Sequence, residues 1–302
     1  MRAIMITFGC LFLLLLAAGK SFAQNNPDST MLYRIETVNG NEYIGNIMHQ
    51  DSLKIYFKSS QLGAITITRA DIRNMNMIDA QSMKAGKYWY PNPQSTRYFW
   101  SPNGYGLKAG EAYYQNVWVL YNQISVGLTD YFSIGAGMIP LFLLGGLPSP
   151  VWIVPKLSIP VVKDKFNLGA GAIIGTVIGA DTKGIGIVYG VSTFGNRDNN
   201  LSFGLGYGFA GGQWAKTPLI NLSGMVRVSR STYLLSENYF IGFGNDLFSM
   251  MSIGGRTLIH QSAGIDYGLI IPLNSGSNVA LPWLGITVPF GKVQKMTKTP
   301  AR

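Results

Sequence analysis

The sequence predicts an all-β protein: a transmembrane antiparallel β-barrel of about twelve strands, preceded by a small soluble β-barrel domain. The first observation is the stretch LSFGLGYGFAG at residues 201–211, where large apolar residues alternate with glycine and serine. Successive side chains of a strand point to opposite faces, so this segment has one apolar and one almost bare face. Apolar residues outward with small or polar residues inward are typical of a barrel strand set in lipid. The second observation is that this alternation recurs through the last two thirds of the chain, in segments of roughly ten residues, the length at which a tilted strand crosses a bilayer.

Composition supports this class and excludes others. The 302 residues include 37 glycines, and only 13% are charged, about half the usual share of a globular protein. The formal net charge is +10, but Lys and Arg are scattered and form no stripe interleaved with aromatic residues, which argues against nucleic-acid binding. A modest basic excess instead fits contact with outer-membrane lipid and lipopolysaccharide phosphates.

Residues 1–23 are predicted to be a secretory signal peptide. Arg2 gives the positive start, residues 4–18 the apolar segment, and Ser21-Phe22-Ala23 a small-x-small cleavage site. The single cysteine, Cys10, lies inside this segment, so the mature chain is expected to hold neither disulfides nor thiolate metal sites. Residues 24–31 are polar and expected to be disordered.

Residues 32–78 are predicted to form the small domain. Short alternating runs flank Asn39-Gly40, a strong hairpin signal, and charged residues occupy the outer parity, so we expect a domain that lies in the periplasm. This run resembles the Sm-like and SH3-like small β modules, on the residues Gly40, Gly45, Gly63, Ile65, Ile67 and Ile72. Residues 79–94, with glycine and two prolines, are expected to be a linker.

The barrel is predicted over residues 95–292, followed by a basic C-terminal tail at 293–302. Its expected strands are 96–101, 111–129, 132–141, 151–162, 166–178, 184–194, 201–211, 219–228, 232–241, 247–259, 263–273 and 281–290. The number falls to ten if segments with disturbed alternation or internal proline fail to pair. Tyr98, Phe99 and Trp100 are expected in an interfacial aromatic girdle, and residues 103–110 in the first outer loop.

A periplasmic start places the short connections 130–131, 163–165, 196–200, 229–231 and 260–262 on the periplasmic side. The stretches EAYYQNVWVLYNQISVGLTDYFSIGAG (111–137) and TFGNRDNNLSFGLG (193–206) resemble a group of uncharacterised outer-membrane β-barrel proteins of Gram-negative bacteria. The resemblance covers roughly residues 30–292. It implies a location in the cell outer membrane and no particular activity or cofactor.

One arrangement raises a catalytic alternative. His260 and Ser262 are spaced as in the His-x-Ser pairs of outer-membrane phospholipases and lipid A deacylases, in which His can deprotonate Ser, and Asn274 follows at the spacing of an orienting residue. The predicted topology, however, places His260 in a periplasmic turn and Asn274 in an outer loop. The pattern therefore favours a polar turn histidine, as it does for His49.

Four charged residues fall within predicted strands, where exposure to lipid would be costly: Arg227, Glu237, Arg256 and Asp266. They are expected to face the lumen and pair with one another, either plugging it or lining a narrow polar path. The sequence thus predicts a non-enzymatic outer-membrane β-barrel with a structural, adhesive or narrow-pore role, without cofactor or metal. The alternative is a lipid-modifying hydrolase using His260 and Ser262. A periplasmic partner of the small domain is also expected, of unspecified kind.

Overall fold

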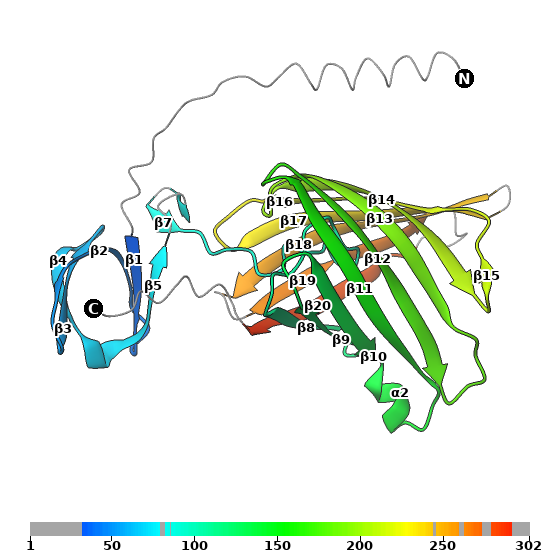
Figure 1. Cartoon of the computed structure of the whole chain (residues 1–302), viewed down its shortest axis with the longest axis horizontal. Coiled ribbons are helices and arrows are strands. Elements are labelled where there is room, and N and C mark those ends of the chain that lie inside the picture. The colour runs from blue at the N-terminus through cyan, green and yellow to red at the C-terminus, as the bar shows by residue number, and fades with distance from the viewer. Residues whose placement is uncertain are drawn as a thin grey trace, which may run out of the picture.

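The structure is a computed structural model that describes residues 32–78, 82–84, 86–243, 246–259, 263–273 and 279–291. Within these residues it consists of a small five-stranded sheet and a large closed barrel (Figure 1). The predicted signal peptide (1–23), the segment 24–31 and the tail 293–302 lie outside the described residues, as do His260, Ser262 and Asn274. None of the helices in the described part of the chain is long and apolar enough to cross a membrane.

The small sheet, here called the module, is antiparallel in the order β4-β3-β2-β1-β5. Its strands are β1 (Leu32–Thr37), β2 (Glu42–Gln50), β3 (Lys54–Ser59), β4 (Gly63–Thr68) and β5 (Ile72–Ile78), with the 3-10 turn η1 (Arg69–Asp71) before the last strand. Gly40, with a φ of 86°, supplies the left-handed conformation needed by the turn between β1 and β2. The inward parity of the strands forms a core of fully or nearly buried residues: Ile35, Ile55, Phe57 and Ile67. A small β domain at this place is what the alternation predicted.

The segment predicted as a linker contains a short hairpin. Strands β6 (Met83–Lys84) and β7 (Lys87–Tyr88) pair across Gly86, and Tyr88 and Tyr90 are buried in a cluster with Ile78. The connection therefore packs on the module before the chain reaches the barrel.

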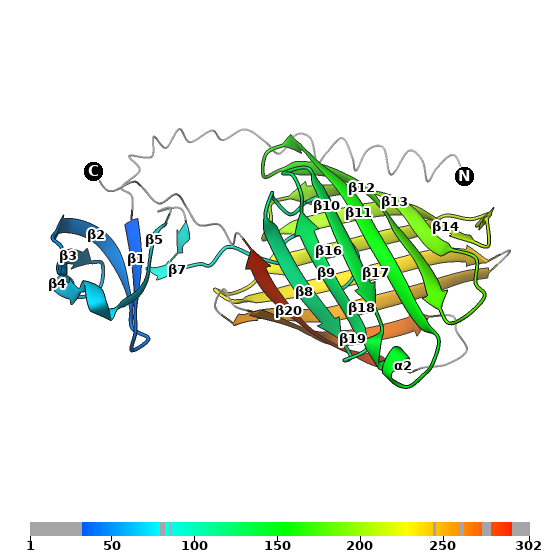
Figure 2. The same ribbon diagram turned by 60° about the horizontal axis from the view of Figure 1, so that its bottom comes forward.

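The barrel contains seven strands, β8–β14, and five strands, β16–β20, twelve in all. Each pairs antiparallel with its neighbours, and the sheet closes because β20 pairs with β8 (Figure 2). The strands are β8 (Glu111–Val117), β9 (Tyr121–Gly127), β10 (Phe132–Met138), β11 (Ser149–Val162), β12 (Phe166–Ile178), β13 (Ile185–Gly195), β14 (Asn200–Ala210), β16 (Leu219–Arg227), β17 (Thr232–Phe243), β18 (Asp246–Ile259), β19 (Ala263–Leu273) and β20 (Leu281–Gly291), while the two-residue β15 (Gln213–Trp214) extends the connection after β14.

The predicted twelve-stranded barrel is confirmed, but two of its predicted strands are wrong. Residues 96–101 form no barrel strand, and they lie inside the lumen. Residues 111–129 are two strands instead of one, because the chain reverses at Trp118 and Val119, whose φ values are 52° and 67°. The two errors offset each other in the count. Neither Trp nor Val is a residue that favours a left-handed turn, so residue types at this position do not indicate the reversal.

The inside and outside of the wall follow the alternation that the sequence predicted. On β14 the even-numbered residues Ser202 and Gly204 are buried, while Leu201 and Phe203 are 54% and 49% exposed. This exposed apolar parity continues around the barrel and gives it a lipid-facing belt. Pro155 and Pro160 remain within β11, with a register shift beside Pro160 that accommodates the missing donor.

The two ends of the barrel differ. The turns at 163–165, 196–199 and 229–231 lie at the end nearest the module, here called the module end. The opposite, distal end carries the connection with the short helix α2 (Pro140–Leu144), which lies far from the module in both views (Figures 1 and 2). These module-end turns have three or four residues and the connection with α2 is longer, but the distal connection 118–120 has three residues as well.

Candidate functional site: a plugged barrel lumen

The lumen at the module end is filled by the chain itself. Residues 92–107, here called the plug, run from the module into the barrel before β8 begins. Gln94, Tyr98 and Asn103 are fully buried there, at 0% exposure. The expected aromatic girdle at Tyr98 and Phe99 and the expected outer loop at 103–110 are therefore wrong. Most of these residues are packed inside the barrel, where a pattern of alternation cannot distinguish them from lipid-facing ones.

The plug folds back on itself at its tip. Tyr98 N–H donates to the Ser101 carbonyl at 2.9 Å, and Arg97 forms an antiparallel bridge with Pro102. The Asn103 side chain closes the base, since its amide donates to the Ser95 carbonyl at 2.9 Å. These local bonds satisfy much of the backbone of a segment that belongs to neither a helix nor a sheet.

A three-residue ionic cluster attaches the plug to the wall. Arg256 on β18 donates from Nε to Asp266 Oδ1 at 2.5 Å and from Nη2 to Oδ2 at 3.0 Å, across the register pair that joins β18 to β19. Arg97 on the plug donates from Nη1 to the same carboxylate at 2.9 Å. All three side chains are at most 4% exposed. One buried carboxylate thus serves two guanidinium groups, and buried charges of this kind are stable only when paired and hydrogen-bonded.

The remaining donors of Arg256 bind the plug backbone. Its Nη1 donates to the Gln94 carbonyl at 2.8 Å and its Nη2 to the Tyr98 carbonyl at 2.6 Å. The five N–H groups of a guanidinium fork let one side chain hold the carboxylate and two turns of backbone together. Arg256 is therefore the central attachment point of the plug.

Glu237 on β17 holds the tip. Its Oε2 accepts the backbone N–H groups of Trp100 and Ser101, both at 3.0 Å, and its Oε1 accepts the Tyr239 hydroxyl at 2.7 Å. These contacts differ from the predicted pairing of Glu237 with another charged residue of a strand. The carboxyl group instead accepts the backbone N–H groups at the turn of the plug, as a capping residue does at the end of a helix.

Arg227 lies at the module end of β16. It forms an ion pair with Asp198 at 3.0 Å and lies over the rings of Trp89 and Tyr233 at 4.8 and 5.1 Å. Of the four charged strand residues expected to face the lumen and pair with one another, the structure brings together Arg256 and Asp266, and gives Arg227 and Glu237 other partners. All four are buried.

Two further residues of this site were not foreseen from the sequence. Lys156 on β11 is buried and donates to the plug carbonyls of Thr96, at 3.1 Å, and Tyr105. Arg97 lies in the segment 96–101, which the sequence predicts to be a strand, so the prediction does not include its role in the cluster. For Lys156 a signal existed, because a lysine on the inward parity of a spanning strand needs a polar partner in the lumen.

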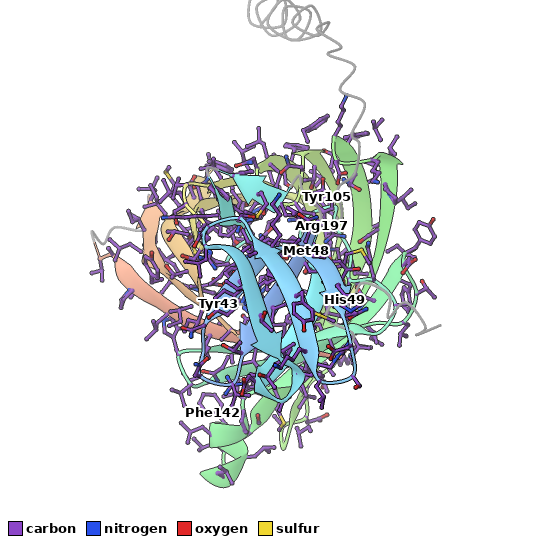
Figure 3. The ribbon with its side chains drawn as sticks, turned by 90° about the vertical axis from the view of Figure 1, so that its left-hand side faces the viewer. Tyr43, Met48, His49, Tyr105, Phe142 and Arg197 are labelled. Atoms are coloured by element: carbon purple, nitrogen blue, oxygen red, sulfur yellow. The ribbon has the colours of Figure 1, made fainter. Side chains whose placement is uncertain are left out.

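The base of the plug is closed by a cation–aromatic contact at the module end. Arg197, in the turn between β13 and β14, lies 4.9 Å from the ring of Tyr105 and donates to Ser95 Oγ and to the Gly106 carbonyl. Figure 3 views this end along the barrel, with Arg197 and Tyr105 next to each other behind the module.

His49 lies on β2 of the module, exposed and beside Tyr56, and is part of a strand where a turn was expected. In the part of the chain that the structure describes, no group of three acidic, His or Cys residues is arranged to hold a metal ion.

Comparison with known proteins adds little to this picture. No protein-family model and no curated protein matches the chain. Among solved structures, the chain is similar to OmpT of Vibrio cholerae, an in-vitro folded outer membrane protein in its trimer form, with a TM-score of 0.28 and 10% identity over 86% of this chain and 96% of that one. A likeness of that degree carries no argument. The twelve paired strands, the apolar outer belt and the short turns at one end make the chain an outer-membrane-type β-barrel on their own.

Proposed function

We propose that the protein is a closed, non-enzymatic scaffold of the bacterial outer membrane, which holds its N-terminal module at the periplasmic face. The observation that carries this proposal is the plug: residues 92–107 fill the lumen at the module end and bind its wall through buried groups. A barrel of about twelve strands already leaves little free bore once side chains fill it. A chain segment folded into the module end of that bore closes it to ions.

Polar contacts distributed around the wall support a stable closed state. The plug is bound by Arg256 on β18, Asp266 on β19, Glu237 on β17 and Lys156 on β11. Because opening would break several of these contacts at once and leave charges unpaired in the lumen, the open state is strongly disfavoured.

The module is positioned by a second set of contacts. Glu42 on β2 accepts from Nη2 of Arg34 and from Nη2 of Arg230, both at 3.3 Å, and from the Tyr90 hydroxyl at 3.1 Å; Arg230 lies in the turn between β16 and β17. Burial alone would raise the pKa of Glu42, but the hydrogen bond and positive charge of Arg34, with Arg230 nearby, hold it below its usual value. The module therefore has a defined seat on the barrel end, which supports a role in presenting it to an envelope partner. The apolar belt faces outer-membrane lipid and lipopolysaccharide.

Three measurements test this function. Purified protein reconstituted in planar lipid bilayers is expected to show no steady conductance, and steady open channels in the wild type would overturn the closed scaffold in favour of a narrow pore. Outer-membrane fractions should contain a band that migrates fast unboiled and shifts on boiling, as a closed barrel does. Hydrolysis of phospholipid or lipid A by the wild type, abolished in Ser262→Ala, would overturn the non-enzymatic role.

A further inference from the structure

The distal half of the lumen, beyond the plug tip, is an apolar chamber. Two cavities of about 800 Å³ and 270 Å³ occupy it, and they adjoin each other, because Trp100, Ile173 and Ile187 line both. We call this space the distal chamber; its other large apolar wall residues include Trp152, Phe248 and Ile241. Together the two cavities reach the size that small-molecule sites have in proteins.

The polarity of the wall changes at the plug tip. Along β13 the buried or half-buried inward residues are Thr193 near the module, followed by Val191, Tyr189 and Ile187, which line the smaller cavity. Along β16 they change from Arg227 at the module end to Leu219 in the chamber. No charged residue lines either cavity among the described residues. A water-filled channel would require the polar pattern to continue to the distal end, and it stops at the tip.

Glycines on β14 make the room. Gly204, Gly206 and Gly208 occupy the inward parity of this strand, and Gly204 and Gly206 line the smaller cavity while Gly208 lines the larger. A Cβ on Gly206 would come within 2.9 Å of the far end of the Ile187 side chain, so glycine lets the wall close around that residue without a shift of its side chain. The glycine parity of the stretch 201–211 is thus one wall of the chamber.

The floor of the chamber is formed by aromatic rings and by paired polar groups, whereas the buried hydroxyl of the wall residue Tyr189 has no hydrogen-bond partner among the described residues. Trp100 at the plug tip contacts the Tyr121 ring at 5.4 Å, and Tyr121 stacks on Trp152 at 4.7 Å. Beside them, Ser101 Oγ donates to Asn221 Oδ1 at 3.0 Å, and the Glu237 carboxyl group next to the floor is occupied by plug N–H groups and Tyr239. The floor therefore offers surface and weak hydrogen-bonding capacity, but no free charge to balance a charge on a ligand.

We propose that the distal chamber binds an uncharged, single-chain amphiphile, such as a long-chain alcohol or ester, which enters from the distal mouth. The hydrocarbon chain lies against Ile173, Ile187 and Trp152, and the small polar end remains at the mouth or meets the hydroxyls beside the floor. The plug closes the chamber at the module end, so the chamber is a binding pocket with one entrance and is distinct from a conduction path. This inference goes beyond the scaffold role and does not depend on it.

The test uses a neutral probe and a matched pair of variants. Full-length protein in lipid nanodiscs is irradiated with a long-chain alcohol that carries a diazirine, and the labelled peptides are identified by mass spectrometry. Ile187→Trp fills the chamber, since Ile187 lines both cavities. Val188→Trp adds the same ring at the next residue, whose side chain is 44% exposed on the lipid-facing parity. Heat-modifiable mobility confirms that each variant forms a closed barrel.

The expected result is labelling of chamber residues in the wild type and in Val188→Trp, and labelling at least about tenfold lower in Ile187→Trp, which corresponds to about 1.4 kcal/mol of binding free energy. Should Ile187→Trp not fold, Ile241→Trp fills the same space. Labels confined to the lipid-facing residues of the wild type would overturn the proposal. Equal chamber labelling by the carboxylate analogue of the probe would overturn the uncharged class.

The origin of the ligand is resolved by competition. An excess of free unlabelled alcohol that suppresses chamber labelling identifies a solute taken up from outside, whereas suppression by a neutral lipid ester in the nanodisc identifies a membrane lipid. Chamber labelling that neither competitor reduces would show non-specific capture and would overturn the proposal.

Discussion

Replacing Asp266 by Asn should release the plug. Asn keeps the size of the side chain but removes the single negative charge shared by Arg97 and Arg256, both of which are nearly or fully buried. Removing one partner of a buried ion pair costs about 3–5 kcal/mol, because the remaining charge stays uncompensated. Here two guanidinium groups lose the same carboxylate, and one of them belongs to the plug.

That free energy sets the size of the expected effect. A factor of ten in an equilibrium constant corresponds to about 1.4 kcal/mol, so the ratio of displaced to seated plug should rise by about two to three and a half powers of ten. The displaced state leaves the module end of the lumen open. Planar bilayer recordings of Asp266→Asn should therefore show opening events at least about a hundredfold more often than the wild type.

Two comparisons isolate the cause. Asp181→Asn removes the same charge at an exposed distal connection and should leave the recordings unchanged. Arg97→Met removes only the plug partner and should act more weakly, because Arg256 keeps both of its bonds to Asp266. If Asp266→Asn forms a heat-modifiable barrel that is as silent as the wild type, the ionic cluster does not hold the plug and the reasoning is wrong.

Three other perturbations give separate outcomes. The pKa of Glu42 is lowered in the folded protein, so its contribution to seating the module is complete above about pH 4.3, the ordinary pKa of Glu. This contribution is lost as the pH falls through the lower pKa of the folded state. Energy transfer between dyes on the module and the barrel should therefore drop at that pH, and Glu42→Gln should remove the pH dependence. Gly104→Ala places a Cβ 2.6 Å from the Asn167 carbonyl oxygen, and should lower the free energy of unfolding by about 1–3 kcal/mol in urea, whereas Gly190→Ala, which has nothing within 4 Å, should not; equal midpoints would contradict the tight fit of the plug. Phe57→Ala empties a fully buried site of the module and should cost about 3–5 kcal/mol, seen by circular dichroism as a module transition well below that of the barrel; an unchanged module transition would refute the assigned core.

The wall of the barrel could be predicted from the sequence because lipid imposes a strict alternation. Leu201 and Phe203 face lipid and Ser202 faces the lumen, as the parity requires. The same rule placed Arg256 and Asp266 on the inner face, where they pair. In these cases lipid lies on one side of the strand and the polar lumen on the other, so the residue type indicates to which side the side chain points.

The plug could not be predicted, because that condition fails inside the lumen. Tyr98 and Phe99 are as apolar as girdle residues, yet they pack against inward-facing Leu235 and Trp283 in a core enclosed by the barrel. Ile173 and Ile187 are apolar and still face inward, because the distal chamber is itself apolar. Such contacts depend on how the closed wall surrounds the segment, and the alternation of residue types along one strand does not predict them.

The plug precedes the barrel in the chain, yet the strand that completes the barrel binds it. The seam joins Glu111 to Gly291, and β20 reaches the plug where the Thr287 carbonyl accepts from Gln94 and the Thr287 hydroxyl from Arg97. Pairing over so long a sequence separation is slow, because the entropy of a large loop is lost before the seam contributes. The plug is synthesised before the strand that completes the barrel, and it offers that strand hydrogen-bonding partners when the seam forms.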